Sequence, residues 1–270
     1  MLFPVLFILL LLPGAKGQFH AIHISESRMA KMQMDGDSTD WDWMPRAKYI
    51  SRAAMSQAIM PYTLLGVPVG EDSLDFKFVV GWNDVTNRIY VLAMVHDRKR
   101  GKELVIPGNY FFFSDGFEIM CNPMSNALDG HTLKYHFIFP MANKQDEVSL
   151  DTGPKWIKES KRDIEFAGKL WKAKDGSYVA VYEISLSLWD GWDDRGPIFS
   201  KRHHLAANQQ FPLGFWFDND TYQDAERLMQ WTTVKSANAK WDPFELSSFV
   251  MDAPVEKGAR WAGANRVLKP

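Results

Sequence analysis

The alternation of hydrophobic and polar side chains is clearest between Asp75 and Asp97, where it predicts two β-strands joined by a turn. From Phe76 to Val80 every second side chain is a large apolar one, which is the period of a strand buried mainly on one face. Asn83 to Asn87 supplies turn residues, because Asn and Asp side chains hydrogen-bond to nearby backbone. Ile89 to Val95 is almost wholly apolar, so this strand is expected to be covered on both faces. We expect three core positions in this hairpin: Trp82, Tyr90 and Val91.

Shorter stretches with the same alternation recur along the chain, separated by turn residues. Strands are expected at Phe117 to Cys121, Thr132 to Phe139, Ile164 to Trp171, Tyr178 to Leu186, Leu213 to Phe217, Trp231 to Val234 and Glu245 to Val250. Gln18 to Met34 is expected to be an extended lead-in or edge strand. Helices are few and short, at Trp156 to Lys158 and from Thr221 to Met229 after a cap at Asp218 to Asp220. This spacing predicts an all-β protein, an antiparallel β-sandwich with jelly-roll or immunoglobulin-like layers and a few short helices.

The N-terminal residues have the pattern of a secretory signal peptide. Leu2 to Leu12 is apolar and uncharged, but it is shorter than the roughly 20 residues that a membrane-spanning helix needs. Ala15 and Gly17 place small residues before a cut that would leave Gln18 first. We therefore expect residues 1–17 to be a signal peptide and residues 18–270 to be one domain, secreted or periplasmic, with no stable membrane insertion. A segment retained in the membrane is the alternative.

Composition narrows the classes of partner. The formal net charge is −2 at pH 7, which argues against nucleic acid, since such a partner requires a basic face. Cys121 is the single cysteine, so internal disulfides are excluded, and we expect it to be a small buried hydrophobe. The 11 Trp and 18 Phe residues exceed what one ligand site needs, so some of them must be structural.

Three further motifs each allow a functional and a structural interpretation. The Asp residues between Asp35 and Asp40 supply oxygens that could hold calcium, or they form an Asp-Gly turn with Trp41 in the core. Trp189 to Asp194 lies on a long loop and is either an aromatic ligand platform or a loop anchored in the core. His203 and His204 are adjacent but have no third metal ligand at useful spacing, so we expect polar loop residues.

Several motifs, taken together and in order, resemble the family-nine carbohydrate-binding modules and the related DOMON-like sandwiches. The similar stretches are Asp35 to Trp41, the hairpin at Val80 to Asp97, Asp115 to Ile119, Gly214 to Asp220, Trp231, and Trp241 to Pro243 before Phe249. The resemblance implies a sugar-binding β-sandwich.

The resemblance also implies candidate site residues. Trp231 falls on one of the two tryptophans that grip a sugar in that family, and Glu118 falls on a sugar-contacting glutamate. The second ring would lie just before Asp115, where this chain has Phe112 and Phe113 instead of tryptophan. An aromatic face covers the C–H face of a sugar ring, and a carboxylate accepts its hydroxyl hydrogen bonds. The alternatives are a core position for Trp231 and a solvated one for Glu118.

These observations favour an exported, non-catalytic carbohydrate-binding domain that serves polysaccharide breakdown, with a separate glycoside hydrolase as a candidate partner. It requires no cofactor, and calcium remains open. One alternative is a glycoside hydrolase using paired carboxylates such as Glu118 and Glu183, which would have to lie about 5 to 10 Å apart. Another is a haem-binding DOMON-like protein, with ligands among the 13 Met and seven His residues.

Overall fold

The computed structural model describes residues 18–59, 74–98, 116–122, 133–138, 148–159, 162–220, 228–233 and 246–254. The proposed signal peptide, Phe112 and Phe113 lie outside these ranges. The strands are β1 (Phe19–His23), β2 (Ile50–Ser51), β3 (Ser56–Ile59), β4 (Leu74–Asn83), β5 (Arg88–Asp97), β6 (Gly116–Cys121), β7 (Leu133–Ile138), β8 (Val148–Thr152), β9 (Ile164–Lys172), β10 (Tyr178–Leu186), β11 (Trp189–Gly191), β12 (Lys201–Arg202), β13 (Gln210–Asp220), β14 (Leu228–Thr232) and β15 (Ser247–Met251). The helices are α1 (Glu26–Met29), α2 (Lys155–Glu159) and the 3-10 turns η1 (Ser38–Trp41), η2 (Arg46–Lys48), η3 (Arg52–Ala54) and η6 (Pro197–Phe199).

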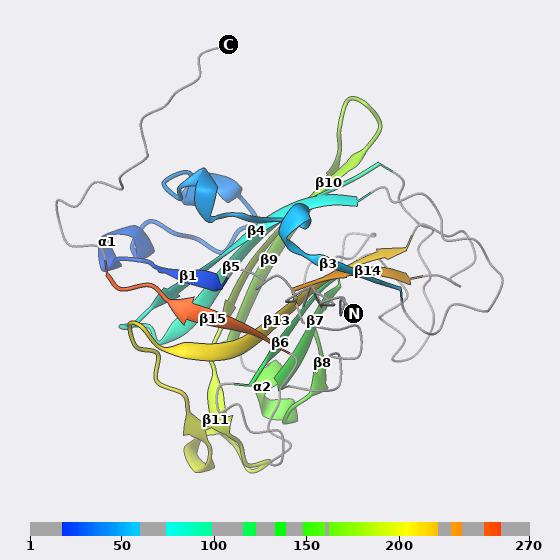
Figure 1. Cartoon of the computed structure of the whole chain (residues 1–270). Coiled ribbons are helices and arrows are strands. Elements are labelled where there is room, and N and C mark those ends of the chain that lie inside the picture. Colours follow the sequence, from blue (N-terminus) through cyan, green and yellow to red (C-terminus); the bar gives the residue numbers. More distant parts are fainter. Residues whose placement is uncertain are drawn as a thin grey trace, which may run out of the picture.

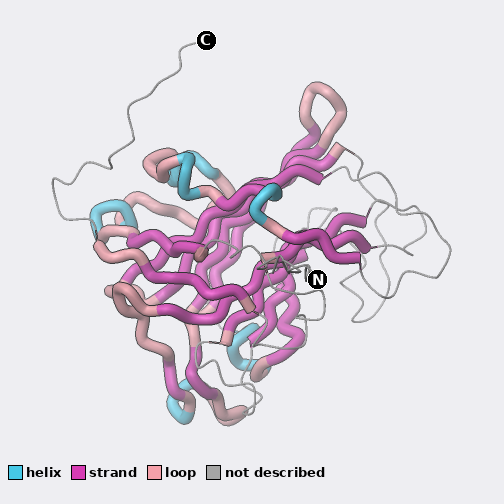
Figure 2. Tube along the Cα trace, in the orientation of Figure 1, coloured by secondary structure: helices cyan, strands magenta, loops and turns pink. Residues whose placement is uncertain are grey.

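Strands dominate the described chain, and most of them join one curled sheet (Figures 1 and 2). Its main path runs β8-β7-β6-β13-β15-β1-β4-β5-β10-β9, with β2, β3 and β14 attached beside it. Strands β11 and β12 form a separate two-stranded sheet. The all-β prediction is confirmed, and α2 confirms the short helix expected around Trp156. In the described part of the chain, no helix is long and apolar enough to cross a membrane.

Curling brings the two ends of the sheet face to face, so that aromatic side chains fill the space between two layers. Phe76 of β4 stacks on Phe217 of β13 with ring centroids 3.9 Å apart. Phe117 of β6 lies against Tyr182 of β10 at 5.8 Å. Burying each such ring removes a large apolar area from water, and the ring pairs add about 0.5–1.5 kcal/mol beyond that burial. The predicted β-sandwich is therefore confirmed.

The β4–β5 hairpin forms as its pattern predicts. The two strands pair in register from Leu74 opposite Asp97 to Asn83 opposite Arg88. Asn83 holds the turn: its side-chain oxygen accepts hydrogen bonds from both the backbone N–H and the hydroxyl of Thr86, while its amide donates to the Ile24 carbonyl. The expected core positions are confirmed, since three residues are buried: Trp82, Tyr90 and Val91.

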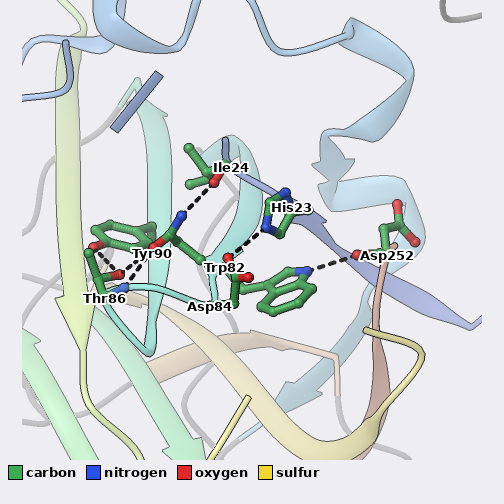
Figure 3. A network of polar contacts seen from close by, with 8 residues as sticks. His23, Ile24, Trp82, Asp84, Thr86, Tyr90 and Asp252 are labelled. Carbon is green, nitrogen blue, oxygen red and sulfur yellow. Dashed lines mark hydrogen bonds and ion pairs between the residues drawn. The ribbon is translucent and has the colours of Figure 1, made fainter. Parts of the chain in front are cut away.

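Polar contacts at this end of the hairpin attach it to both terminal strands (Figure 3). His23 of β1 contacts Asp84 of the turn through Nε2 and Oδ1, 3.0 Å apart. The Trp82 indole donates to the Asp252 carbonyl just after β15, at 3.1 Å. The Asp252 carboxylate in turn contacts His20, at 2.6 Å. These residues fix the position of the hairpin relative to the ends of the domain.

Two local predictions were wrong because pairing with distant strands overrides local sequence. The extended lead-in expected within Gln18 to Met34 is present as β1, but the edge-strand alternative is wrong, because β1 lies inside the sheet and pairs in parallel with both β15 and β4. Asp218 to Asp220 belong to β13 and pair with β14, and the last two residues of the expected helix, Leu228 and Met229, are in β14; its other residues lie outside the described ranges. The polar triplet that resembles a cap is thus the end of a long strand.

Candidate functional site

The layer formed by β4, β5, β10 and β9 has an outer face, away from the aromatic core, that carries several polar groups. Side chains of a strand alternate between faces, and Tyr182 points into the core. The neighbouring positions Val181 and Glu183 therefore belong to the outer face. Residues from α1 to Tyr49 cover much of it, packing around Val79, Leu92 and Val181. We call this covered part the capped half.

Glu183 anchors the capped half. Its Oε2 accepts hydrogen bonds from the backbone N–H groups of Asp35 and Gly36, at 3.1 and 2.7 Å. Its Oε1 accepts one from the Trp41 indole, at 2.9 Å. Burial of the carboxyl raises its pKa, although the three donors oppose that shift. Glu183 is thus completely enclosed and serves as the attachment point of the turn.

The aspartates of this turn accept hydrogen bonds from their own backbone. Asp35 accepts from the Asp37 N–H at 2.8 Å, and Asp37 accepts from the Thr39 N–H at 3.0 Å. Asp40 accepts from the Gln33 N–H at 2.7 Å. Trp41 is buried, so the prediction of an Asp-Gly turn with a core tryptophan is confirmed. Within the described ranges, no three His, Cys, Asp or Glu side chains are grouped to hold a metal ion.

Glu118 lies on the outer face of the opposite layer and is also buried. It pairs with Trp216 of β13, and Met120, Trp216 and Leu246 form a small apolar cluster on that face. Gly214 leaves room for this cluster, because a Cβ there would lie 2.7 Å from both Trp216 and Leu246. The solvated alternative for Glu118 is therefore wrong. A ligand role would require Glu118 to become accessible, and it stays a prediction.

Trp231 lies in β14, where the sequence predicts a strand. It pairs with Phe217, which in turn pairs with Phe117. Glu118 is the next residue after Phe117 in β6 and pairs with Trp216. Because successive residues of a strand alternate between faces, Trp231 and Glu118 occupy positions on opposite faces of the sheet. The sheet register alone does not bring these two predicted site residues together, and the ligand role of Trp231 stays a prediction.

Glu118 and Glu183 lie on opposite outer faces of the sandwich. Each follows a residue of the Phe117–Tyr182 contact across the core, so their side chains point outward on opposite sides of the sandwich. The two packed layers and their aromatic core therefore lie between the two carboxyl groups. A glycosidase pair faces one shared cleft, so these two carboxylates do not form one.

The long loop after β10 is held by buried contacts. Trp189 is buried and meets Trp156 edge-on, with ring centroids 5.0 Å apart. This confirms the core-anchored interpretation for that tryptophan. His203 is enclosed with Asp190, which contacts its Nδ1. Its Nε2 accepts from the amide of Gln209 at 2.8 Å. Both ring nitrogens of His203 are therefore engaged within the protein.

Beyond the capped half, the same outer face carries a row of side chains that is more accessible to solvent. Strand pairing aligns the four residues of this row, which we call the open row: Trp171, Val179, His96 and Asp75. Trp171 is 46% exposed, Val179 and His96 are half-buried, and Asp75 is exposed. His96 Nε2 lies 2.6 Å from the Ser177 hydroxyl, which donates to Asp175 at 2.5 Å. An exposed indole thus lies beside a hydrogen-bonded polar chain.

Trp171 ends a strand that the sequence predicts, and no site was predicted there. The sequence does carry a signal, because the charged residues Glu165 and Lys169 share the two-residue period of Trp171, which is typical of an outward face. Both are exposed in the structure. Cys121, by contrast, was predicted correctly. It is buried in the core, and burial raises the pKa of its thiol to about 12.

Comparison with known proteins shows the fold. No protein-family model matches the chain, and no curated protein sequence matches it. A family 9 carbohydrate-binding module from Caldicellulosiruptor kristjanssonii, solved with cellotriose, is similar with a TM-score of 0.51 and 14% identity, covering 94% of this chain and 100% of that one. The structure of such a module from the same organism with glucose gives a TM-score of 0.52 at 14% identity, over 89% and 98% of the two chains. The chain has the fold of these modules.

Proposed function

We propose that this protein is a non-catalytic carbohydrate-binding domain. The observation that carries the proposal is the shared sandwich, which extends over 94% of this chain in the comparison with a module solved with cellotriose. The motifs from Asp35 to Phe249 support it independently, since they occur in the order typical of that family. The placement of Glu118 and Glu183 on opposite outer faces removes this specific carboxylate pair.

The binding site proposed from the family resemblance comprises Trp231, Glu118, Phe112 and Phe113. In this proposal an aromatic ring covers the apolar face of a sugar, and polar groups meet its hydroxyls. Export through residues 1–17 and service to a separate glycoside hydrolase complete the proposal. Both follow from the sequence pattern and from the family.

The test is binding of cellotriose, measured by calorimetry with the wild type and with Trp231→Ala. We expect the variant to lose at least roughly tenfold in affinity, a change of about 1.4 kcal/mol. Phe199→Ala is the matched control, because Phe199 is an exposed aromatic residue on the separate β11–β12 hairpin. Equal affinity of wild type and Trp231→Ala would remove Trp231 from the site.

A screen of other oligosaccharides and polysaccharides covers a different sugar preference. Failure of the wild type to bind any of them would contradict the proposed function itself. Release of reducing sugar by the purified protein would favour an enzyme instead.

A further inference from the structure

The open row has the chemical composition of a surface that binds sugar chains. Trp171 is a large exposed aromatic side chain on this face of the sheet, and it shares a cross-strand row with His96 and Asp75. An indole covers the C–H face of a sugar ring, while imidazole and carboxylate groups exchange hydrogen bonds with its hydroxyls. The row thus offers both kinds of contact that a sugar requires.

The polar members of this surface are fixed in place by their own contacts. The His96 ring is held by the Ser177 hydroxyl, and Ser177 is itself held by Asp175. The Ser177 N–H also donates to Asp175, at 3.0 Å. Side chains held in one geometry lose less conformational freedom when a ligand binds. The β9–β10 hairpin that carries Trp171 and Ser177 projects from the body of the domain (Figure 1).

The shape and charge of this surface fit an extended, neutral chain. Neighbouring strands lie about 4.8 Å apart, so Trp171 and Asp75, three strands apart, span roughly 14 Å of sheet surface. Exposed charges of both signs lie on this surface or beside it: Lys77, Arg98, Lys169, Asp75 and Asp175. The two carboxylates disfavour an anionic polymer, which requires a surface of predominantly positive charge.

We propose that the open row, centred on Trp171 and His96, is a second carbohydrate-binding surface that takes the interior of a neutral polysaccharide chain. It rests on the proposed function, but it is distinct from the site around Trp231. Trp171 is the stacking platform, and His96 is the principal hydrogen-bonding group. The two surfaces allow one domain to hold two sugar segments at once.

The experiment is affinity electrophoresis in native gels that contain hydroxyethylcellulose, xylan or galactomannan. The proteins are wild type, Trp171→Ala, Trp171→Phe, His96→Ala, Trp231→Ala and the control Phe199→Ala. We expect Trp171→Ala to lose at least roughly tenfold in affinity for the retained polysaccharide, and Trp171→Phe to lose less because a ring remains. Cellotriose binding by Trp171→Ala should stay at the wild-type value, since the short sugar occupies the Trp231 site.

The outcomes separate the two proposals. Retardation of Trp171→Ala equal to that of the wild type overturns the second surface and leaves the proposed function standing. Loss in Trp171→Ala with none in Trp231→Ala supports the open row as the surface that holds the polysaccharide, and cellotriose calorimetry of Trp231→Ala then decides the Trp231 site. A wild type that no gel retards overturns the second surface, and cellotriose calorimetry then decides the proposed function separately. Because the Trp171 ring is nearly half exposed, circular dichroism should show a wild-type fold for its variants.

Discussion

The capped half and the open row belong to the same face of the same four strands, yet their side chains have different roles. In the capped half, Glu183 and its neighbours are enclosed by the turn at Asp35 to Trp41. In the open row, Trp171 and Asp75 remain exposed. Both contain an aromatic residue and a carboxylate, but among the described residues only the capped half is covered by another segment of the chain. Exposure, and not residue type, therefore separates a structural tryptophan from a candidate ligand platform.

Among the changes that test this comparison, Glu183→Ala is expected to lower the free energy of unfolding most. Removing the carboxylate leaves three donors without their acceptor in a buried site, and each such group costs about 1–3 kcal/mol. We expect a loss of about 3 kcal/mol or more in the free energy of unfolding, measured with urea. Glu165→Ala is the control, because Glu165 lies on the same face of the neighbouring strand and is exposed. Equal losses in the two variants would refute the anchoring role of Glu183.

A smaller loss of stability is expected from Gly36→Ala, for which Gly176→Ala is the control. Both glycines have positive φ, +76° and +90°, so each alanine costs about 1–2 kcal/mol in backbone strain. At Gly36 the new Cβ would also lie 3.0 Å from the Gly168 backbone, whereas at Gly176 nothing lies within 4 Å. Gly36→Ala should therefore unfold at a lower urea concentration than Gly176→Ala. The reverse order would show that the turn does not press against β9.

The smallest effect is the pH dependence that Glu183 contributes. Burial raises its folded-state pKa above the ordinary value of 4.5, so its favourable contribution is complete below that pH and is lost as the pH rises through the folded-state pKa. The free energy of unfolding of the wild type, minus that of Glu183→Gln, should therefore decrease as the pH rises from about 4.5. A difference that increases with pH would indicate that the three donors outweigh burial.

Local sequence predicted the elements whose pairing is local. The β4–β5 hairpin follows from its alternation and from the turn at Asn83, and the β9–β10 hairpin follows from Asp175 and Gly176. Core positions such as Trp82 and Trp41 were also correct. In these cases, neighbours in the sequence carry the whole signal.

Long-range contacts could not be predicted in this way. Glu183 receives its hydrogen bonds from residues 142 to 148 positions away in the chain, and no spacing rule links such partners. Glu118 is buried on the face opposite Phe117, which alternation within β6 does not reveal. The candidate sites were therefore less predictable than the strands, because they depend on what covers a face.

The position of β1 has a consequence for how the domain folds. Phe19 pairs with Phe249, a separation of 249 − 19 = 230 residues, while Ala21 pairs with Val80 on the other side. During synthesis β1 therefore has only one of its two neighbours until nearly the whole domain has been made. Contacts of such long sequence separation slow folding. We expect a late closing step at the β1–β15 seam, during which the last strand completes the sandwich.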